Sequence, residues 1–183
     1  KYSIPEQAPV ILTISRLTKK NGIEDLIKAL LHLPHEAHLL IVGGGAREKY
    51  LKDLAKDLQL SHRVDWVGEM PHDQLSAYFA AADIFCRPSI SEGLGIVFLE
   101  AMAAGLPVVA TAVGGITDIV KQEETGLLAK PRDPKDIAEK IGRLLLDTAL
   151  RDRIIARALA FVQNGYSWDS LAERLNTIFV QLS

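Results

Sequence analysis

Residues 84–110, IFCRPSISEGLGIVFLEAMAAGLPVVA, decide the fold, because they place one helical stretch between two short apolar runs. We expect buried strands over Ile84–Cys86 and Pro107–Ala110, and a helix over Ile96–Ala104 that ends at Gly105. Apolar strands that alternate with helices are typical of a parallel sheet with helices on both faces. This stretch therefore predicts one strand-helix-strand unit of such a sheet.

The same alternation extends in both directions along the chain. Further strands are expected over Val10–Ile14, His38–Val42, Val64–Val67 and Gly126–Leu128. Further helices are expected over Ile23–Leu31, Arg47–Leu58, Pro71–Ala82, Ile137–Leu146, Leu150–Gln163 and Trp168–Leu182. The sequence thus predicts the α/β class, with a doubly wound parallel sheet of about six strands. The last helix is expected to be an appendage, in which Trp168 either packs on the domain or lies at a junction with another domain.

Length and composition fit one ordinary globular unit. The 183 residues are expected to form a single domain, 1–183, and the start at Lys1 without a methionine indicates a fragment cut at a linker. The net charge of −2 gives no argument for binding nucleic acid, and no apolar run approaches the roughly 20 residues of a membrane span. The single cysteine, Cys86, excludes a disulfide framework. We expect a cytoplasmic protein, and a membrane-peripheral location stays open for the intact molecule.

Ligands of such sheets bind outside the carboxyl ends of the strands. Right-handed crossovers place every strand-to-helix loop at that one edge. The loops expected there are Ser15–Gly22, Gly43–Ala46, Gly68–His72, Arg87–Gly95 and Thr111–Gly115.

Two carboxylates surround the start of the helix that follows Gly93 and Gly95. Glycines allow a ligand to approach the backbone, and the first N–H groups of a helix attract an anion. Glu100 is the only charged side chain between Ile96 and Ala104, so its carboxylate needs hydrogen-bond donors. Sugar hydroxyls would supply them, and an internal arginine or a backbone N–H would do so equally. Glu92, eight residues earlier, lies at the mouth of the same site or is a solvated loop residue.

These residues belong to a longer ordered pattern. Glu92 and Glu100 form an E-x7-E pattern, and the accompanying segments are Ser15-Arg16-Leu17, Lys20-Asn21-Gly22, Ile41-Val42-Gly43, Val67-Gly68, Ala82-Asp83, Pro88-Ser89, Gly114-Gly115 and Glu124–Leu128. Over nearly the whole chain this set resembles the group 1 retaining glycosyltransferases. The resemblance implies a Rossmann-like domain, the C-terminal, donor-binding half of a GT-B glycosyltransferase.

The resemblance implies two residues near the reacting bond. Arg16, together with a nearby lysine, would hold the diphosphate of a nucleotide-sugar, and Glu92 would contact the donor sugar near its anomeric carbon. The lysine usual in the family aligns with Asn21, so Lys20 is the candidate to replace it. Fixed cations would stabilise the charge on the leaving phosphate, so no metal and no other cofactor is expected. No two aspartates are two residues apart, as a DxD metal motif would require.

The resemblance also implies the rest of the donor site. Backbone N–H groups around Gly95, Ile96 and Val97 would bind sugar hydroxyls and phosphate, and Glu100 would hold the ribose hydroxyls. The stretch Trp66-Val67-Gly68 would receive the nucleotide base through backbone groups.

The predicted function is therefore donor binding in a retaining, metal-independent glycosyltransferase. Its partners would be a nucleotide-sugar donor and an N-terminal domain that carries the acceptor site, so the isolated chain is expected to bind nucleotide without transferring sugar. Two alternatives stay open: a nucleotide-sugar epimerase of the same fold, and a non-catalytic binding module, which Asn21 in the lysine position favours.

Three other features have simpler interpretations. His32, His35 and His38 are expected to be surface residues rather than metal ligands, because Pro34 interrupts any helix through them. Gly43–Gly45 lacks a completed dinucleotide-binding pattern and predicts a turn near the nucleotide. Cys86 is expected to be a small core residue.

Overall fold

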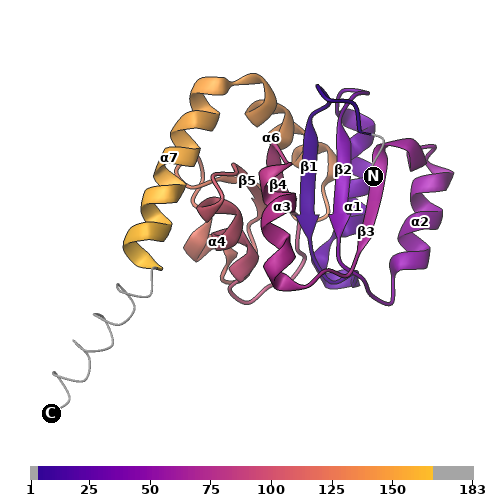
Figure 1. Ribbon diagram of the computed structural model, residues 1–183, viewed down its shortest axis with the longest axis horizontal. Coiled ribbons are helices and arrows are strands. Elements are labelled where there is room, and N and C mark those ends of the chain that lie inside the picture. Colours follow the sequence, from indigo (N-terminus) through magenta and orange to yellow (C-terminus); the bar gives the residue numbers. More distant parts are fainter. Residues whose placement is uncertain (1–3, 167–183) are drawn as a thin grey trace, which may run out of the picture.

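The computed structural model describes residues 4–166, which form a six-stranded parallel sheet flanked by helices (Figure 1). The strands are β1 (Val10–Ile14), β2 (His38–Val42), β3 (Val64–Gly68), β4 (Ile84–Arg87), β5 (Val108–Thr111) and β6 (Leu127–Ala129). Their order across the sheet is β3-β2-β1-β4-β5-β6. The chain thus winds outward from β1 to one edge and then from β4 to the other, which confirms the predicted doubly wound α/β fold.

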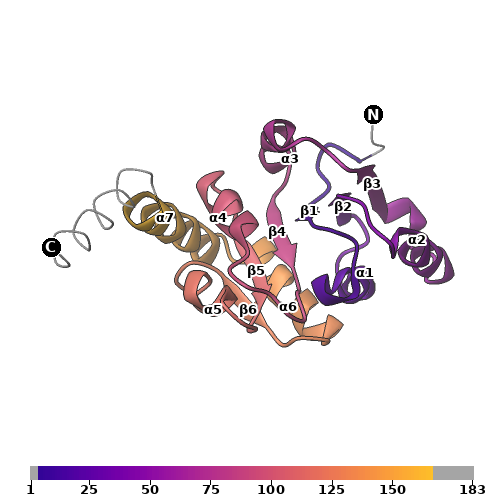
Figure 2. The same cartoon turned by 90° about the horizontal axis from the view of Figure 1, so that it is seen from below.

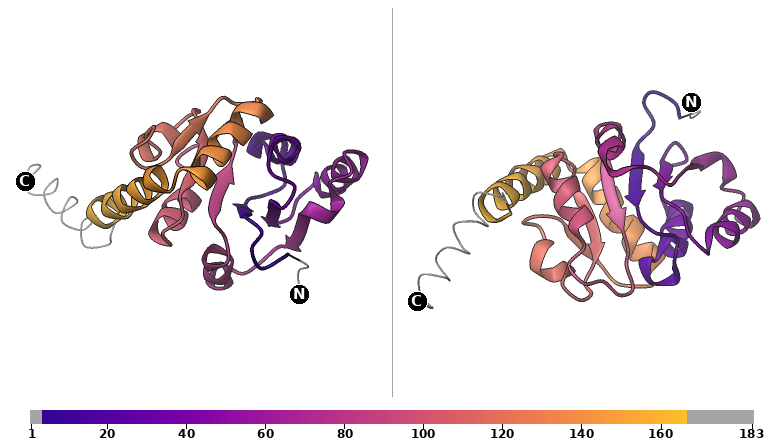
Figure 3. Two further views of the ribbon diagram at one scale, coloured as in Figure 1. Left: turned by 90° about the horizontal axis from the view of Figure 1, so that it is seen from above. Right: turned by 60° about the horizontal axis from the view of Figure 1, so that its bottom comes forward.

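The helices form a layer on each face of the sheet. They are α1 (Ile23–Ala29), α2 (Glu48–Asp57), α3 (Leu75–Ala80), α4 (Ile96–Ala103), α5 (Ile116–Ile119), α6 (Pro134–Leu146) and α7 (Thr148–Gly165). Figures 2 and 3 show α3 and α4 on one face and α1 and α6 on the other. Successive strand side chains point to opposite faces of the sheet, so each strand contributes to both helix layers. Ile11 packs among the residues of α1 and α6, whereas Leu12 packs among those of α3 and α4.

The helix starts follow from local hydrogen bonds. The Asp133 side chain accepts from the Asp136 N–H at 3.1 Å, with Pro134 in the first turn of α6. Asp147 accepts from the Leu150 N–H at 2.9 Å and starts α7. The helix predicted from Pro71 begins instead as a 3₁₀ turn over His72–Gln74, and α3 follows it. The predicted helix Trp168–Leu182 lies outside the described residues.

One histidine prediction is wrong. His32 and His35 are exposed, but His38 is only 7% exposed. It begins β2, which β1 and β3 flank on both sides, and its Nδ1 lies 3.3 Å from Asp65 Oδ2 of β3. The central position of β2 in the sheet therefore buries a polar residue that was expected at the surface.

Cys86 is fully buried, as predicted, and burial raises the pKa of its thiol.

Arg63 fastens the turn that leads into β2. Its guanidinium is 3% exposed and donates to the carbonyls of Ala37, Leu30 and Pro34 at 2.9, 3.0 and 2.6 Å. One buried side chain thus joins three backbone carbonyls of the segment between α1 and β2. No helix within residues 4–166 is both long and apolar enough to cross a membrane.

Candidate functional site

A cavity of about 380 Å³ opens at the carboxyl edge of the sheet. Five segments line it: the ends of β1, β2 and β3, the start of α3, and α4. Their residues are Ile14, Ser15, Arg16, Val42, Gly43, Gly44, Glu69, Met70, Leu75, Val97 and Glu100. β1 and β4 are neighbours from which the chain winds in opposite directions, so the cavity lies at the switch point where ligands of such folds bind. Arg16, Val97 and Glu100, predicted from the sequence as site residues, all lie on its wall.

Backbone hydrogen bonds connect the loops that form the floor of the cavity. The N–H of Ser15 donates to the Val42 carbonyl at 2.9 Å, and that of Leu17 donates to Gly44 at 2.8 Å. Gly43 continues the chain of contacts by donating to the Gly68 carbonyl at 2.8 Å. The ends of three adjacent strands are thereby fixed against one another, so the cavity is preformed.

Glu100 is paired with a residue that sequence reasoning missed. Its Oε1 lies 2.8 Å from His72 Nε2, and the two side chains are 27% and 81% exposed. The hydrogen bond that His72 donates to the Glu100 carboxylate, reinforced by the charge of that carboxylate, raises the pKa of His72. The partner is therefore neither an internal arginine nor a backbone N–H. His72 lies in the β3–α3 loop, which was expected at this edge, but nothing in its spacing relates it to Glu100.

The start of α4 faces the cavity. Gly95 precedes the helix in the left-handed region, at φ 72° and ψ 61°, where glycine is favoured. The first N–H groups of α4 have no partners within the helix, and Val97 lies on the cavity wall. Ile96 is 64% exposed, so this end of the helix is open to a ligand or to another surface.

Glu92 is not among the residues that line this cavity, and it forms a largely buried ion pair. Its carboxylate contacts the Arg87 guanidinium, and each side chain is 12% exposed. Burial lowers the pKa of Arg87, whose Nε also lies 3.2 Å from Ser89 Oγ. Glu92 is therefore not a solvated loop residue, and it lies beside the cavity rather than on its wall.

Gly114 explains how tightly that loop is held. A Cβ at this position would lie 2.0 Å from the Glu92 carbonyl oxygen, and its φ is +53°. Both the close approach and the left-handed backbone require glycine. The β5–α5 loop therefore packs directly against the backbone of the residue predicted to contact the donor sugar.

The basic residues of the β1–α1 loop are arranged unequally. Arg16 is exposed at the cavity rim, and its carbonyl accepts from Asn21 Nδ2 at 2.7 Å. Asn21 is 3% exposed, so it braces the loop from inside rather than presenting its amide to a ligand. Lys20 is exposed and does not line the cavity, while its carbonyl accepts from the Ile90 N–H at 2.6 Å.

The stretch predicted to receive a base ends at the cavity. Val67 is half-buried, and the Gly68 carbonyl accepts the hydrogen bond from the N–H of Gly43. Glu69 and Met70, which follow directly, line the cavity and were not singled out from the sequence. The sequence indicated these two residues only through their position in the Gly68–His72 loop, at the sheet edge where ligands were expected to bind.

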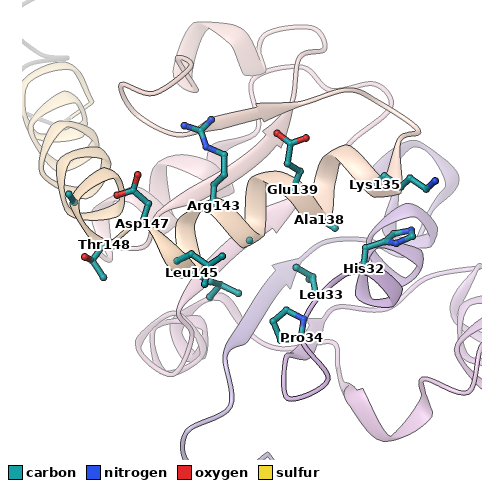
Figure 4. Close-up of a pocket in the computed structure, with 13 residues that line it drawn as sticks. His32, Leu33, Pro34, Lys135, Ala138, Glu139, Arg143, Leu145, Asp147 and Thr148 are labelled. Carbon is teal, nitrogen blue, oxygen red and sulfur yellow. The ribbon is translucent and has the colours of Figure 1, made fainter.

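A larger hollow of about 850 Å³ lies between α6 and the segment before β2 (Figure 4). Its residues include Leu33, Pro34, Glu139 and Arg143, and none of the predicted site residues. The C-terminal end of α6 and the N-terminal end of β2 place it at the opposite edge of the sheet.

Within residues 4–166, no group of three or more histidine, cysteine, aspartate or glutamate side chains could hold a metal ion.

Known proteins resemble this chain in sequence and in fold. Residues 1–161 match the family model described as "Glycosyl transferases group 1". The GDP-mannose-dependent alpha-(1-6)-phosphatidylinositol monomannoside mannosyltransferase of Mycobacterium tuberculosis is 37% identical over 188 residues, which cover 96% of this chain and 48% of that protein. Sucrose-phosphate synthase from Thermosynechococcus elongatus is 36% identical with a TM-score of 0.89, over 97% of this chain and 46% of that one.

A further solved structure carries a bound nucleotide-sugar. HepE of Anabaena in complex with UDP-glucose is 26% identical with a TM-score of 0.88, over 96% of this chain and 49% of that one. This chain spans about half the length of the curated relatives it matches.

Proposed function

The chain belongs to the group 1 glycosyltransferases, whose GT-B fold its structural neighbours share, and from that premise we propose that its cavity binds the nucleotide-sugar donor of a retaining, metal-independent transferase. The observation that carries the proposal is the joint position of Arg16 and Glu100 on one preformed cavity at the switch point of the sheet. A cation and a carboxylate so placed complement the two polar parts of a nucleoside diphosphate, the anionic diphosphate and the ribose diol.

The polar groups suit the chemistry of the transfer. In the ground state, Glu100 accepts hydrogen bonds from the ribose hydroxyls in place of the one from His72. As the bond between sugar and phosphate breaks, negative charge grows on the leaving phosphate oxygen. Arg16 and the free N–H groups of α4 stabilise that charge from fixed positions, which supplies the role that a metal ion plays in other transferases.

Glu92 contributes from beside the cavity. Its pairing with Arg87 orients the carboxylate, a few residues before the helix start where the sugar would lie. The relatives support a nucleotide-sugar as ligand, because one is named GDP-mannose-dependent and another was solved with UDP-glucose. The acceptor would be bound by a further, N-terminal domain, and the isolated chain would bind nucleotide without transferring sugar.

Isothermal titration calorimetry of the chain with GDP, UDP, ADP and the matching nucleosides tests the proposal. Glu100→Gln should weaken diphosphates and nucleosides alike, by about tenfold or more, because both carry the ribose diol. Arg16→Gln should weaken only the diphosphates by a similar factor, because nucleosides lack the anion. Glu36→Gln, an exposed carboxylate before β2, is the matched control and should change neither.

Binding that is absent for every nucleotide in the unaltered chain would overturn the proposal. Binding that survives both Glu100→Gln and Arg16→Gln unchanged would place the nucleotide elsewhere on the molecule. Once an acceptor is known, turnover by the full-length protein would exclude the non-catalytic alternative, in which the buried Asn21 takes the place of a catalytic cation.

A further inference from the structure

Glu69 is a carboxylate of the cavity wall whose oxygens have no partner among the described residues. Its side chain lies flat over Gly44, where a Cβ added to that glycine would meet Glu69 Cγ at 2.8 Å and Oε1 at 2.9 Å. Both residues line the cavity. Glu92 and Glu100 have partners, but within residues 4–166 no hydrogen bond or ion pair engages the Glu69 carboxylate. An unengaged acceptor is therefore presented to whatever fills that end of the cavity.

The positions of the other groups indicate which part of the donor lies there, and this step rests on the proposed function. Glu100 takes the ribose and Arg16 the diphosphate, which leaves the wall formed by Gly43, Gly44, Glu69 and Met70. This wall combines bare glycine backbone, an apolar side chain and one carboxylate. Flat backbone and a methionine suit the faces of an aromatic ring, so the base is the part that fits.

We propose that Glu69 selects guanine, so that the donor is a guanosine-diphospho-sugar. An ionised carboxylate only accepts hydrogen bonds, and it has two oxygens side by side. Guanine presents two adjacent donors, its ring N1–H and its exocyclic N2 amine, which match those oxygens in a bidentate arrangement. Charge-assisted bidentate hydrogen bonds combine strength with geometric selectivity.

The other bases offer the carboxylate less. Uracil has one ring N–H between two carbonyl oxygens, both of which repel a carboxylate. Adenine and cytosine each present an amine beside an unprotonated ring nitrogen, which is itself an acceptor. A carboxylate in the base subsite therefore discriminates by what the wrong base lacks as well as by what guanine supplies.

Calorimetric titration of the chain with GDP, UDP, ADP and inosine diphosphate tests this inference. Inosine diphosphate keeps the N1–H and lacks the N2 amine, so it removes one of the two hydrogen bonds. We expect GDP to bind at least about tenfold more tightly than UDP or ADP, with inosine diphosphate in between. In Glu69→Gln the advantage of GDP over UDP should fall to about threefold or less, because an amide offers one acceptor and its NH₂ opposes the guanine donors.

The control and the contrary outcomes are distinct. Glu36→Gln changes the same charge at an exposed site and should keep the full preference for GDP. Equal affinities for GDP and UDP, or a preference for GDP that persists in Glu69→Gln, would overturn this inference while leaving the donor site intact. Tight binding of UDP that depends on Glu100 would do the same. If no nucleotide binds, the proposed function fails and this inference with it.

Discussion

His72 Nε2 lies 2.8 Å from Glu100 Oε1, so the carboxylate that faces the cavity from α4 is already engaged by an imidazole from the β3–α3 loop. His72 is largely exposed and belongs to a loop, whereas Glu100 is fixed on a helix. A ligand that bonds to Glu100 must therefore compete with a partner that can turn away into solvent.

This competition makes nucleotide binding dependent on pH. The Glu100 hydrogen bond raises the pKa of His72, so the imidazolium pair persists below the ordinary histidine pKa and weakens as the pH rises through the raised value. Any stability that the pair contributes follows the same course, whereas Glu100 becomes freer to bind ribose. We expect affinity for GDP or UDP to increase between about pH 6 and about pH 8, measured by calorimetry.

His72→Gln should flatten that pH profile, because glutamine does not titrate. His62→Gln, which replaces an exposed histidine remote from the cavity, should leave the profile unchanged. A profile that keeps its slope in His72→Gln would show that another group governs it, with Asp73 and Glu69 as the neighbouring carboxylates to examine.

The buried pair of Arg87 and Glu92 predicts an asymmetric response to substitution. Arg87→Met should lower the free energy of unfolding by about 3–5 kcal/mol, because it leaves the Glu92 carboxylate buried without its counter-ion. The double substitution Arg87→Met with Glu92→Leu should recover most of that loss, since no unpaired charge remains. Urea denaturation of the two variants checks this, and equal losses in both would contradict it.

Two glycines offer a matched test of backbone constraint. Gly114→Ala should lower the free energy of unfolding by about 2 kcal/mol, because its Cβ meets the Glu92 carbonyl and its φ is positive. It should also weaken nucleotide binding by displacing the loop before α4. Gly142→Ala lies within α6 with no atom near its added methyl, so it should raise stability by about 1 kcal/mol. Urea denaturation separates the two, and similar effects would contradict the contact assigned to Gly114.

Arg63 should be costly to replace, because its guanidinium holds three backbone carbonyls together. Arg63→Met removes three hydrogen bonds from a buried guanidinium to backbone carbonyls, and we expect the free energy of unfolding to fall by about 3 kcal/mol. Arg157→Met, an exposed residue of α7, should change the unfolding free energy by less than about 0.5 kcal/mol. Chemical denaturation at equilibrium measures both, and a small loss for Arg63→Met would mean that water replaces the guanidinium.

The sheet was predictable from the sequence because its four inner strands, β2, β1, β4 and β5, are short and mostly apolar runs that are buried on both faces. β1 and β2 have the predicted bounds, and the remaining strands differ by a residue or two at their ends. α5 was not predicted, since its four residues are too few to show a helical period. The helix from Pro71 was shortened at its start by a 3₁₀ turn, which a residue pattern cannot distinguish from α-helix.

The sequence predicted single charged residues of the site, but not the contacts that they make with one another. Arg16 and Glu100 stood out because charged residues at strand ends or on apolar helices need a reason. Contacts between separate loops were beyond reach, because His72 and Glu100 are 28 residues apart and meet only through the winding of the sheet. The Arg87–Glu92 pair is close in sequence, yet it depends on a loop conformation that Gly114 imposes from a third segment.

The backbone hydrogen bonds beneath the cavity have a consequence for how such a protein can diversify. Because main-chain atoms join the loops after β1, β2 and β3, side chains above this floor can change without unfastening it. Glu69 on the cavity wall and His72 against Glu100 lie within one short segment between a strand and a helix. That segment can therefore be replaced by itself. Grafting only residues 69–72 from a relative should transfer the base preference of that relative, and leave the rest of the domain unchanged.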